Sequence, residues 1–382
     1  MKRRAIREAI RKALQQIQDA KDRMLKLDFE DFEVVAGLCP MSLLLDTSVA
    51  PKIGRPLTDF VEVIQGVTWG GKGAEQVFDL KEEDVKKLNL EHEVTLKRIG
   101  GEDIKRWHIG WTRRYALFPY VTNKGKWSRA FELIGKDVNK PIYISDALDF
   151  KQVIDDAERR ILQQDLQEDE KLKNILEHRI ALGLIKYPHV ATYLIQHYEQ
   201  LRGRIFEGKT LQEYNKMWYE YHRPRTPIVI RKHKIVGPRL VKMARFALDS
   251  DGFLPRDSVV VMVPKQKAFK DLKSSLDKTL NRETSEEETL LYILAFLNSE
   301  TFDYLLREKI SKKRGGYPIV DERLLQRMGI PIPTRASKNV VEKLLKLVKE
   351  AVSQGCTDKM DEEINKLVKE LYKAEEEEIK TH

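Results

Sequence analysis

Apolar residues recur at spacings of four and three through the first 27 positions of the chain, and mostly Lys, Arg, Gln and Asp stand between them. Such a seam is typical of a long amphipathic helix, which needs a partner to cover its apolar side. The residues that form the seam are Ile6, Ile10, Ala13, Ile17, Ala20, Met24 and Leu27.

Two further apolar stripes lie near the other end of the chain, within Val341–Val352 and Ile364–Leu371, and a break at residues 354–358 separates them. These stripes predict a pair of amphipathic helices. Three arrangements are open at this point: a coiled-coil-like pairing with the N-terminal helix, pairing with another protein, or simple packing on the central part of the chain.

The central part has a different residue pattern, because short β-prone runs alternate with turns from Leu57 to Ile144. This alternation predicts an irregular β-rich domain. A helical pattern then runs from Ala147 to Gln200, with a strongly charged helix near residues 153–176 and a more apolar one at Val190–Leu201. Further strands are expected at Pro227–Ile235 and Asp257–Val263, and one buried helix at Thr289–Leu306.

The patterns together predict an α+β protein: an irregular β-rich domain with inserted helices, flanked by terminal amphipathic helices. We expect an N-terminal helix and linker over residues 1–50, the β-rich domain over 51–335 and the helical pair over 336–382. No internal repeat of fixed period occurs, which argues against solenoids and propellers.

Composition is that of a globular protein, with 41% hydrophobic and 34% charged residues among 382. The net charge is +9, and the positive residues are concentrated in a few short segments. Cys39 and Cys356 are the two cysteines, too far apart in sequence and without the spacing for a zinc site or a disulfide scaffold. The N-terminus is charged and no run is long enough to cross a bilayer, so we expect a cytoplasmic protein without a membrane partner.

Motifs for catalysis are absent from the sequence: it has no phosphate-binding loop with a terminal Lys-Ser/Thr, no nucleophile elbow and no metal-ligand spacing. Gly70-Gly71-Lys72-Gly73 follows a predicted strand without a helical pattern after it, which makes a dinucleotide site a poor interpretation. A nuclease triplet such as Asp79, Lys81 and Glu82 arises easily by chance in a chain this rich in charge.

One stretch, Lys312–Pro333, begins with a basic cluster, breaks at two glycines and continues in an extended segment and a short helical run. Gly315 and Gly316 permit close approach of the backbone to a partner, and Lys312, Lys313 and Arg314 add positive charge. This order indicates a surface loop that faces an anion such as phosphate. The alternative is an ordinary solvated turn between a helix and a strand.

Basic and aromatic residues also alternate in two other segments, residues 97–115 and 218–225. Long cations neutralise phosphates, and aromatic rings can stack on bases or wedge between them, so the pattern favours a nucleic-acid-binding protein. For any single residue, such as Trp107, Trp111 or Trp218, a place in the core beside solvated cations is the alternative.

The order of these segments resembles the TaqI-like C-terminal specificity (target recognition) domain of adenine-N6 DNA methyltransferases and the specificity subunits of restriction-modification systems. The blocks that carry the resemblance run from Leu57 to the C-terminus. In chain order they are VIQGVTWG, LKRIGGEDIKRWHI, YALFPY, YLIQHYEQLRGR, KMWYEYHRPR, KIVGPRL, FALDSDGFLPRDSVV, LYILAFLNSETFDYLL, KKRGGYPIV, LLQRMGIPIP and EEINKLVKELY.

The resemblance implies that the chain clamps double-stranded DNA and reads a short target while a methyltransferase partner, bound through the terminal helices, modifies adenine. It implies no catalytic residue, metal site or cofactor of its own, because the Asn/Asp-Pro-Pro-Tyr/Phe tetrapeptide of such enzymes is absent from the sequence. S-adenosylmethionine is expected on the partner. The expected DNA-contacting residues are Lys72, Arg98, Lys105, Arg106, Trp218, Tyr219, Arg223, Arg225, Lys312, Lys313, Arg314, Gly315, Gly316 and Tyr317.

Two other functions are kept open. The chain could be the C-terminal part of a site-specific adenine methyltransferase or type II restriction enzyme, or it could be a scaffold whose terminal coiled coil binds protein. The Met1-initiated amphipathic helix favours a separate subunit over a part of a larger enzyme.

Overall fold

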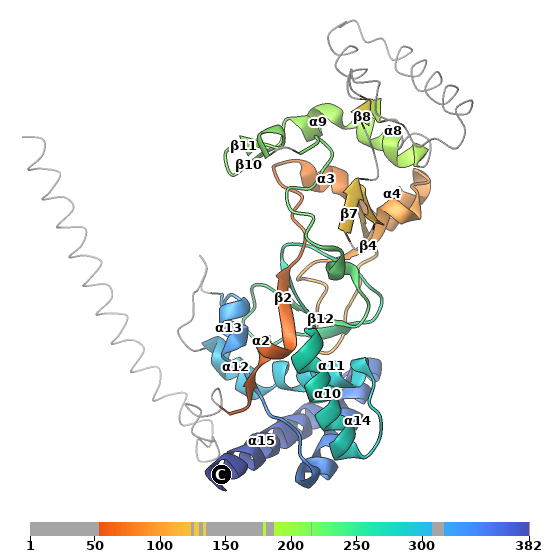
Figure 1. Cartoon of the computed structure of the whole chain (residues 1–382). Helices are drawn as coiled ribbons and strands as arrows, with labels where there is room; N and C mark the ends of the chain where they lie inside the picture. The colour runs from red at the N-terminus through yellow and green to blue at the C-terminus, as the bar shows by residue number, and fades with distance from the viewer. Residues whose placement is uncertain are drawn as a thin grey trace, which may run out of the picture. The chain divides into compact units, whose positions relative to one another are not determined.

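The computed structural model describes residues 53–123, 126–129, 133–134, 179–180, 187–214, 216–307 and 317–381 of the chain. Helices and strands are both abundant among them, which confirms the predicted α+β class (Figure 1). Contacts group Pro51–His382 into one compact unit. The predicted N-terminal helix and the charged helix near residues 153–176 lie outside the described residues.

One antiparallel four-stranded sheet joins segments that are far apart in sequence, in the order β13 (Ala247–Asp249), β12 (Lys234–Pro238), β15 (Val259–Pro264) and β2 (Val61–Gln65). The five residues from Val259 to Val263 are all buried. A continuous apolar run is typical of a strand covered on both faces, which explains why β15 lies between two other strands.

A second four-stranded sheet has the order β14 (Leu254–Pro255), β4 (Thr95–Ile99), β5 (Arg114–Leu117) and β3 (Asp79–Lys81). β14 pairs with β4 in parallel, and the other two pairs are antiparallel. Since β14 and β15 follow one another closely in sequence, residues 254–264 connect the two sheets.

Helices and aromatic residues complete this part of the chain. Helices α3 (Ala74–Phe78), α4 (Glu82–Lys87), α8 (Pro188–Gln196) and α9 (Tyr198–Arg202) contribute to one buried cluster with β5. The ring of Tyr221 makes edge-on contacts with Phe78 and Phe118, at centroid distances of 5.0 and 5.3 Å. Its hydroxyl donates to the Leu117 carbonyl at 2.6 Å, which satisfies its buried polar atom.

The remaining helices pack together beside the first sheet: α10 (Gln266–Leu280), α11 (Glu286–Leu297), α12 (Glu300–Arg307), α14 (Lys338–Gln354) and α15 (Asp358–Thr381) (Figure 1). Ten consecutive residues of α11, Glu288–Leu297, are buried, so it is the central helix of the group. Helices α14 and α15 contact each other, and both contact α11. The C-terminal pair therefore packs on the rest of the compact unit, the third of the arrangements considered above.

Short elements connect these parts. They are β1 (Arg55–Pro56), α2 (Leu57–Phe60), η3 (His92–Val94), β6 (Tyr120–Asn123), β7 (Lys126–Arg129), β8 (Leu133–Ile134), β9 (Arg179–Ile180), β10 (Ile205–Phe206), β11 (Lys209–Thr210), η4 (Gln212–Tyr214), η5 (Pro227–Ile230), α13 (Glu322–Gln326), β16 (Gly329–Ile330) and η6 (Arg335–Ser337).

Three sequence predictions about these elements are wrong in part. Pro227–Ile230 forms a 3-10 turn, and only the later part of the predicted strand joins a sheet, as β12. Residues 74–78 form α3, so Gly73 does precede a helix, although one of only five residues. The predicted helix at 289–306 is two helices, because the Asn298 side chain bonds both the amide and the carbonyl of Phe246 and ends α11 there.

The start of α11 provides a prediction about pH. The Glu288 carboxylate accepts hydrogen bonds from Arg282 at 2.8 and 3.0 Å, from Lys349 and from the Ser285 amide. The Arg282 hydrogen bonds are the largest cause that lowers its pKa to about 2. Glu288→Gln is expected to cost about 2 kcal/mol at neutral pH, a figure reduced from the full linkage value because both cations are half exposed.

Because the pKa of Glu288 is lowered in the folded protein, its contribution is present above the unfolded carboxyl pKa and is lost as pH falls. The stability difference between wild type and Glu288→Gln should therefore shrink between about pH 5 and about pH 2 in urea titrations. Glu283→Gln, at a side chain that is 89% exposed, is the control and should change little. A difference that stays constant over this pH range would contradict the assignment.

Candidate nucleic-acid interface

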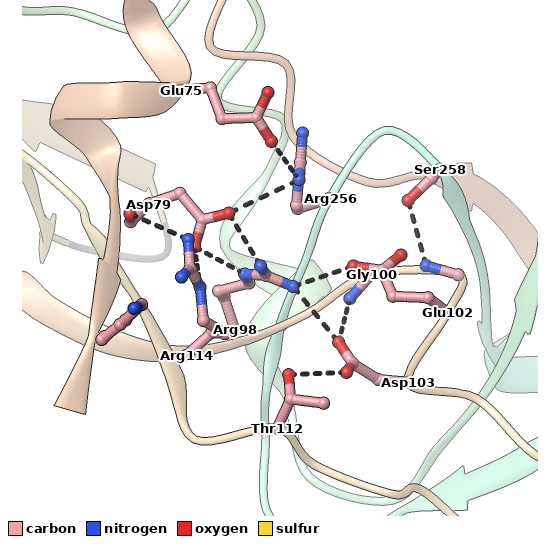
Figure 2. A network of polar contacts seen from close by, with 12 residues as sticks. Glu75, Asp79, Arg98, Gly100, Glu102, Asp103, Thr112, Arg114, Arg256 and Ser258 are labelled. Carbon is pink, nitrogen blue, oxygen red and sulfur yellow. Dashed lines mark hydrogen bonds and ion pairs between the residues drawn. The ribbon is translucent and has the colours of Figure 1, made fainter.

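Three arginines share one buried aspartate where the second sheet meets residues 254–264, which connect the two sheets (Figure 2). Asp79 accepts from Arg98 at 2.9 and 2.7 Å and from Arg114 Nε at 2.9 Å, and it lies 3.5 Å from Arg256 Nη1. The Arg256 guanidinium also lies 4.4 Å from the centroid of the Trp69 ring. These contacts fix the three guanidiniums in place.

Arg98 was expected to contact DNA, and its position corrects that expectation. The residue is 4% exposed, and its Nη1 also donates to Asp103 and Glu102 at 3.2 Å each. Burial alone would lower the pKa of Arg98, but the hydrogen bonds to Asp79 and the nearby carboxylates raise it. A guanidinium that is buried and surrounded by carboxylates cannot neutralise a phosphate, so we assign Arg98 a structural role.

Lys105 and Arg106 are neighbours with different surroundings. Lys105 is exposed, and its ammonium donates to the Glu102 carbonyl at 3.1 Å. Arg106 pairs with Asp361 of α15 at 2.7 Å and donates to the Asn298 carbonyl at the end of α11. In this arrangement Arg106 connects the loop after β4 with the C-terminal helices, so the structure does not present it for DNA contact, whereas Lys105 remains available.

Trp218 and Tyr219 are 3% and 0% exposed, so their rings cannot stack on bases, and we remove both from the expected DNA contacts. Their segment is held by Arg204, which is 2% exposed. Its five N–H donors reach the main-chain carbonyls of Leu201, Trp69, Gly70, Trp218 and Glu220 at 2.7 to 3.3 Å. Burial lowers the pKa of Arg204 to about 10, so it is charged at neutral pH.

Arg225 lies at the end of the first sheet, in the left-handed conformation with φ 63°. Its Nε donates to the Gly66 carbonyl at 3.1 Å and its Nη2 to Gln65 Oε1 at 3.2 Å, just where β2 ends. Burial first, and then the charges of Arg223 and Arg239, lower the pKa of Arg225. The Arg223 and Arg239 guanidiniums therefore lie close enough to act on the charge of Arg225, and their effect exceeds that of the Asp257 carboxylate, which raises its pKa. A site where cations outweigh carboxylates favours binding of an anion.

Arg239 follows β12 at the same end of the sheet, because Gln65 opposes Val260 and Pro238 opposes Val259. The Arg239 carbonyl accepts from the Val320 amide at 2.8 Å, which pairs this segment with the residues that follow the predicted RGG loop. Three residues after Arg239, the Lys242 ammonium lies 5.0 Å from the centroid of the Tyr317 ring, and Tyr317 is 41% exposed.

We call Arg223, Arg225, Arg239, Lys242 and Tyr317 the basic edge. Arg223 is exposed, and both side chains of its ion pair with Glu207 are exposed. Among the described residues no carboxylate lies within ion-pair distance of Arg225, Arg239 or Lys242. The structure thus brings together parts of two sequence clusters, the one around 218–225 and the one that ends at Tyr317.

Lys72 is exposed in the turn between β2 and α3, four residues after Thr68, which exchanges main-chain hydrogen bonds with Arg223. Gly70 and Gly71 both have φ near +80° there, and a Cβ on Gly70 would lie 2.5 Å from that of His222. The turn therefore requires glycine at this position. The predicted contacts Lys312, Lys313, Arg314, Gly315 and Gly316 lie outside the described residues.

Comparison with known proteins adds two solved structures. A type IIL restriction-modification enzyme, MmeI in complex with DNA, matches over 84% of this chain and 33% of its own, with 9% identity and a TM-score of 0.38. The type IIG restriction endonuclease BpuSI matches over 86% and 33%, with 12% identity and a TM-score of 0.36. This chain spans about a third of the length of each. No protein-family model and no curated protein matches it.

Two residues of the basic edge, Arg239 and Lys242, were not among the predicted contacts. The sequence feature that could have indicated them is a basic residue at every third position from Arg239 through Arg245, with apolar residues between. Across the ranges that the structure describes, no group of His, Cys, Asp and Glu is placed to hold a metal ion, and no helix has the length and hydropathy to span a membrane.

Proposed function

We propose that this chain is a sequence-specific DNA-binding module of a restriction-modification system, and that it directs an adenine-specific DNA methyltransferase to its target site. The observation that carries the proposal is the basic edge, where four cations converge at one end of a sheet and the described residues place a carboxylate in ion-pair contact only with Arg223. The blocks that resemble target recognition domains include four residues of this edge, which are Arg223, Arg225, Arg239 and Tyr317.

The chemistry of the edge suits a DNA backbone. Long cations that are free of carboxylates release counterions from phosphates when they bind, and a guanidinium held by fixed acceptors loses little conformational entropy on binding. Arg225 is held in this way by Gln65 and the Gly66 carbonyl. Arg223, Arg239 and Lys242 extend the same positive surface towards Tyr317.

In this proposal the chain recognises DNA and a methyltransferase performs the reaction. The sequence lacks the Asn/Asp-Pro-Pro-Tyr/Phe tetrapeptide, so S-adenosylmethionine and the catalytic residues belong to the partner. The predicted N-terminal amphipathic helix is the proposed contact with that partner, because the apolar stripes of the C-terminal pair are buried in the compact unit. The proposal applies equally to a methyltransferase on a separate chain and to one in the same polypeptide.

Binding to fluorescein-labelled duplex DNA of random sequence, measured by anisotropy across salt concentrations, tests the proposal. The variant Arg239→Gln/Lys242→Gln is expected to bind about tenfold more weakly at low salt. The slope of log affinity against log salt should fall in magnitude by about two, since each phosphate contact contributes about one. The matched control is Lys267→Gln/Lys270→Gln on α10, which removes the same charge from two exposed lysines.

Equal losses in the two double variants would show that total charge, rather than the basic edge, attracts the DNA. An affinity that is independent of salt would reject phosphate binding altogether. Selection of duplexes from a random library then tests specificity, because a target recognition module should enrich one short sequence and a nonspecific cation surface should enrich none.

A further inference from the structure

The segment from Arg239 to Arg245 is a short loop that is anchored at both ends. At its start, Leu240 pairs with Ile319, and the Val241 amide donates to the Pro318 carbonyl at 3.3 Å. At its end, the Ala244 amide donates to Asp303 Oδ1 at 2.5 Å. Since both ends are tied to other elements, the residues between them are positioned before any ligand binds.

The side chains of this loop fall into a buried group and an exposed group. Val241 and Ala244 are 3% and 1% exposed and point into the core. Leu240 and Met243 are 39% and 57% exposed, and Lys242 between them is exposed as well. Two large apolar side chains in water, three residues apart in one anchored loop, are costly to leave uncovered, which indicates a surface that binds something.

The charge around these apolar residues indicates which class of partner binds them. A cation stands at every third position of the loop, at Arg239, Lys242 and Arg245, and no described carboxylate is paired with any of the three. A protein interface core is usually depleted of charge. An apolar tip surrounded by cations instead matches nucleic acid, where phosphates flank an apolar stack of bases.

We propose that Leu240 and Met243 form a wedge that enters the base stack of bound duplex DNA and unstacks one base step. The inference rests on the proposed function, since it assigns a role to two apolar residues within the same DNA-binding surface. Leu and Met are among the side chains that proteins insert between base pairs. The predicted aromatic wedges do not have this role, because Trp107 and Trp218 are 0% and 3% exposed.

Unstacking a base step costs a few kcal/mol, which neighbouring phosphate contacts can offset. Arg239 and Lys242 lie directly beside the wedge and are able to supply such contacts. An opened step would also lower the cost of extruding an adenine into the active site of a partner. Flexible pyrimidine–purine steps, which unstack most easily, are the expected position of the wedge.

The experiment uses the duplex enriched by selection with the full chain, with 2-aminopurine in place of each adenine in turn. Wild-type protein is expected to raise 2-aminopurine fluorescence severalfold at one position, because unstacking removes quenching. Leu240→Ala/Met243→Ala should lose most of that rise. Its affinity should change by less than about tenfold and its salt slope should not change, because lost contacts and avoided unstacking offset each other.

Leu88→Ala is the matched control, at a leucine that is 36% exposed after α4, and it should keep the wild-type signal. Unchanged circular dichroism and urea midpoint establish that the double variant is folded. A wild-type fluorescence rise in the folded double variant overturns the wedge. A self-association that only the double variant loses also overturns it, and assigns the surface to a second copy of the chain.

Failure of the wedge and failure of the proposed function give different results. Tight, salt-dependent binding that depends on Arg239 and Lys242 but produces no change in 2-aminopurine fluorescence rejects the wedge alone. Selection that enriches no sequence, or binding that is insensitive to Arg239→Gln/Lys242→Gln, rejects the proposed function and the wedge with it.

Discussion

Replacing Arg204 with methionine is expected to destabilise the protein by about 3 to 5 kcal/mol, because five main-chain carbonyls lose their donor at one buried position. Methionine fills a similar volume, so the loss comes from unsatisfied acceptors and not from an empty cavity. Urea unfolding followed by tryptophan fluorescence measures it, and Trp69 and Trp218 lie in the region that Arg204 holds.

Arg202→Met provides the comparison for this prediction. Arg202 has a side chain that is 41% exposed and pairs with Glu199 one turn earlier in α9, an interaction that is worth a few tenths of a kcal/mol. The two variants remove the same chemical group two residues apart. Equal midpoints for the two would mean that the Arg204 hydrogen bonds contribute no more than a surface ion pair.

Asp79→Asn is expected to cost about 3 to 5 kcal/mol, because it leaves the buried Arg98 guanidinium without its bidentate carboxylate and also removes the partner of Arg114. An amide keeps the size of the side chain but provides one acceptor oxygen and no charge. The change should appear as a lower urea midpoint at neutral pH.

Glu102→Gln is the matched control for Asp79→Asn, because Glu102 binds the same Arg98 at 3.2 Å but has a side chain that is 60% exposed. We expect it to change stability by less than about 0.5 kcal/mol, as is usual for an exposed pair. If the two variants are equally destabilised, burial does not control the strength of these ion pairs.

The sequence predicted the α+β class and several strands from local patterns, and the failures have physical causes. Helix α10 was missed, although Phe269, Leu272, Leu276 and Leu280 have helical spacing and are buried. The division between α11 and α12 depends on a hydrogen bond from Phe246, which is 52 residues away from Asn298. Local patterns carry no information about partners that are so distant in sequence.

The candidate site was predictable to a different extent. Clusters of cations are visible in the sequence, but the fold decides which of these cations is paired with a carboxylate. Arg98 and Arg106 were expected at the surface and instead bind Asp79 and Asp361, which lie 19 and 255 residues away in the chain. The sequence showed that Arg223 and Arg225 are basic, but the sheet end that places Arg239 beside them required β2, β12 and β15 to pair.

Arg204 also has a consequence for how such proteins diverge. Its five hydrogen bonds all go to main-chain oxygens, and every residue type has one. Substitutions at Trp69, Trp218 or Glu220 would leave those hydrogen bonds in place, so the loops can change sequence while they keep their positions. We therefore expect Arg204 to be retained while the residue types around it change. The backbone arrangement of these loops would then be kept longer than any sequence motif in them.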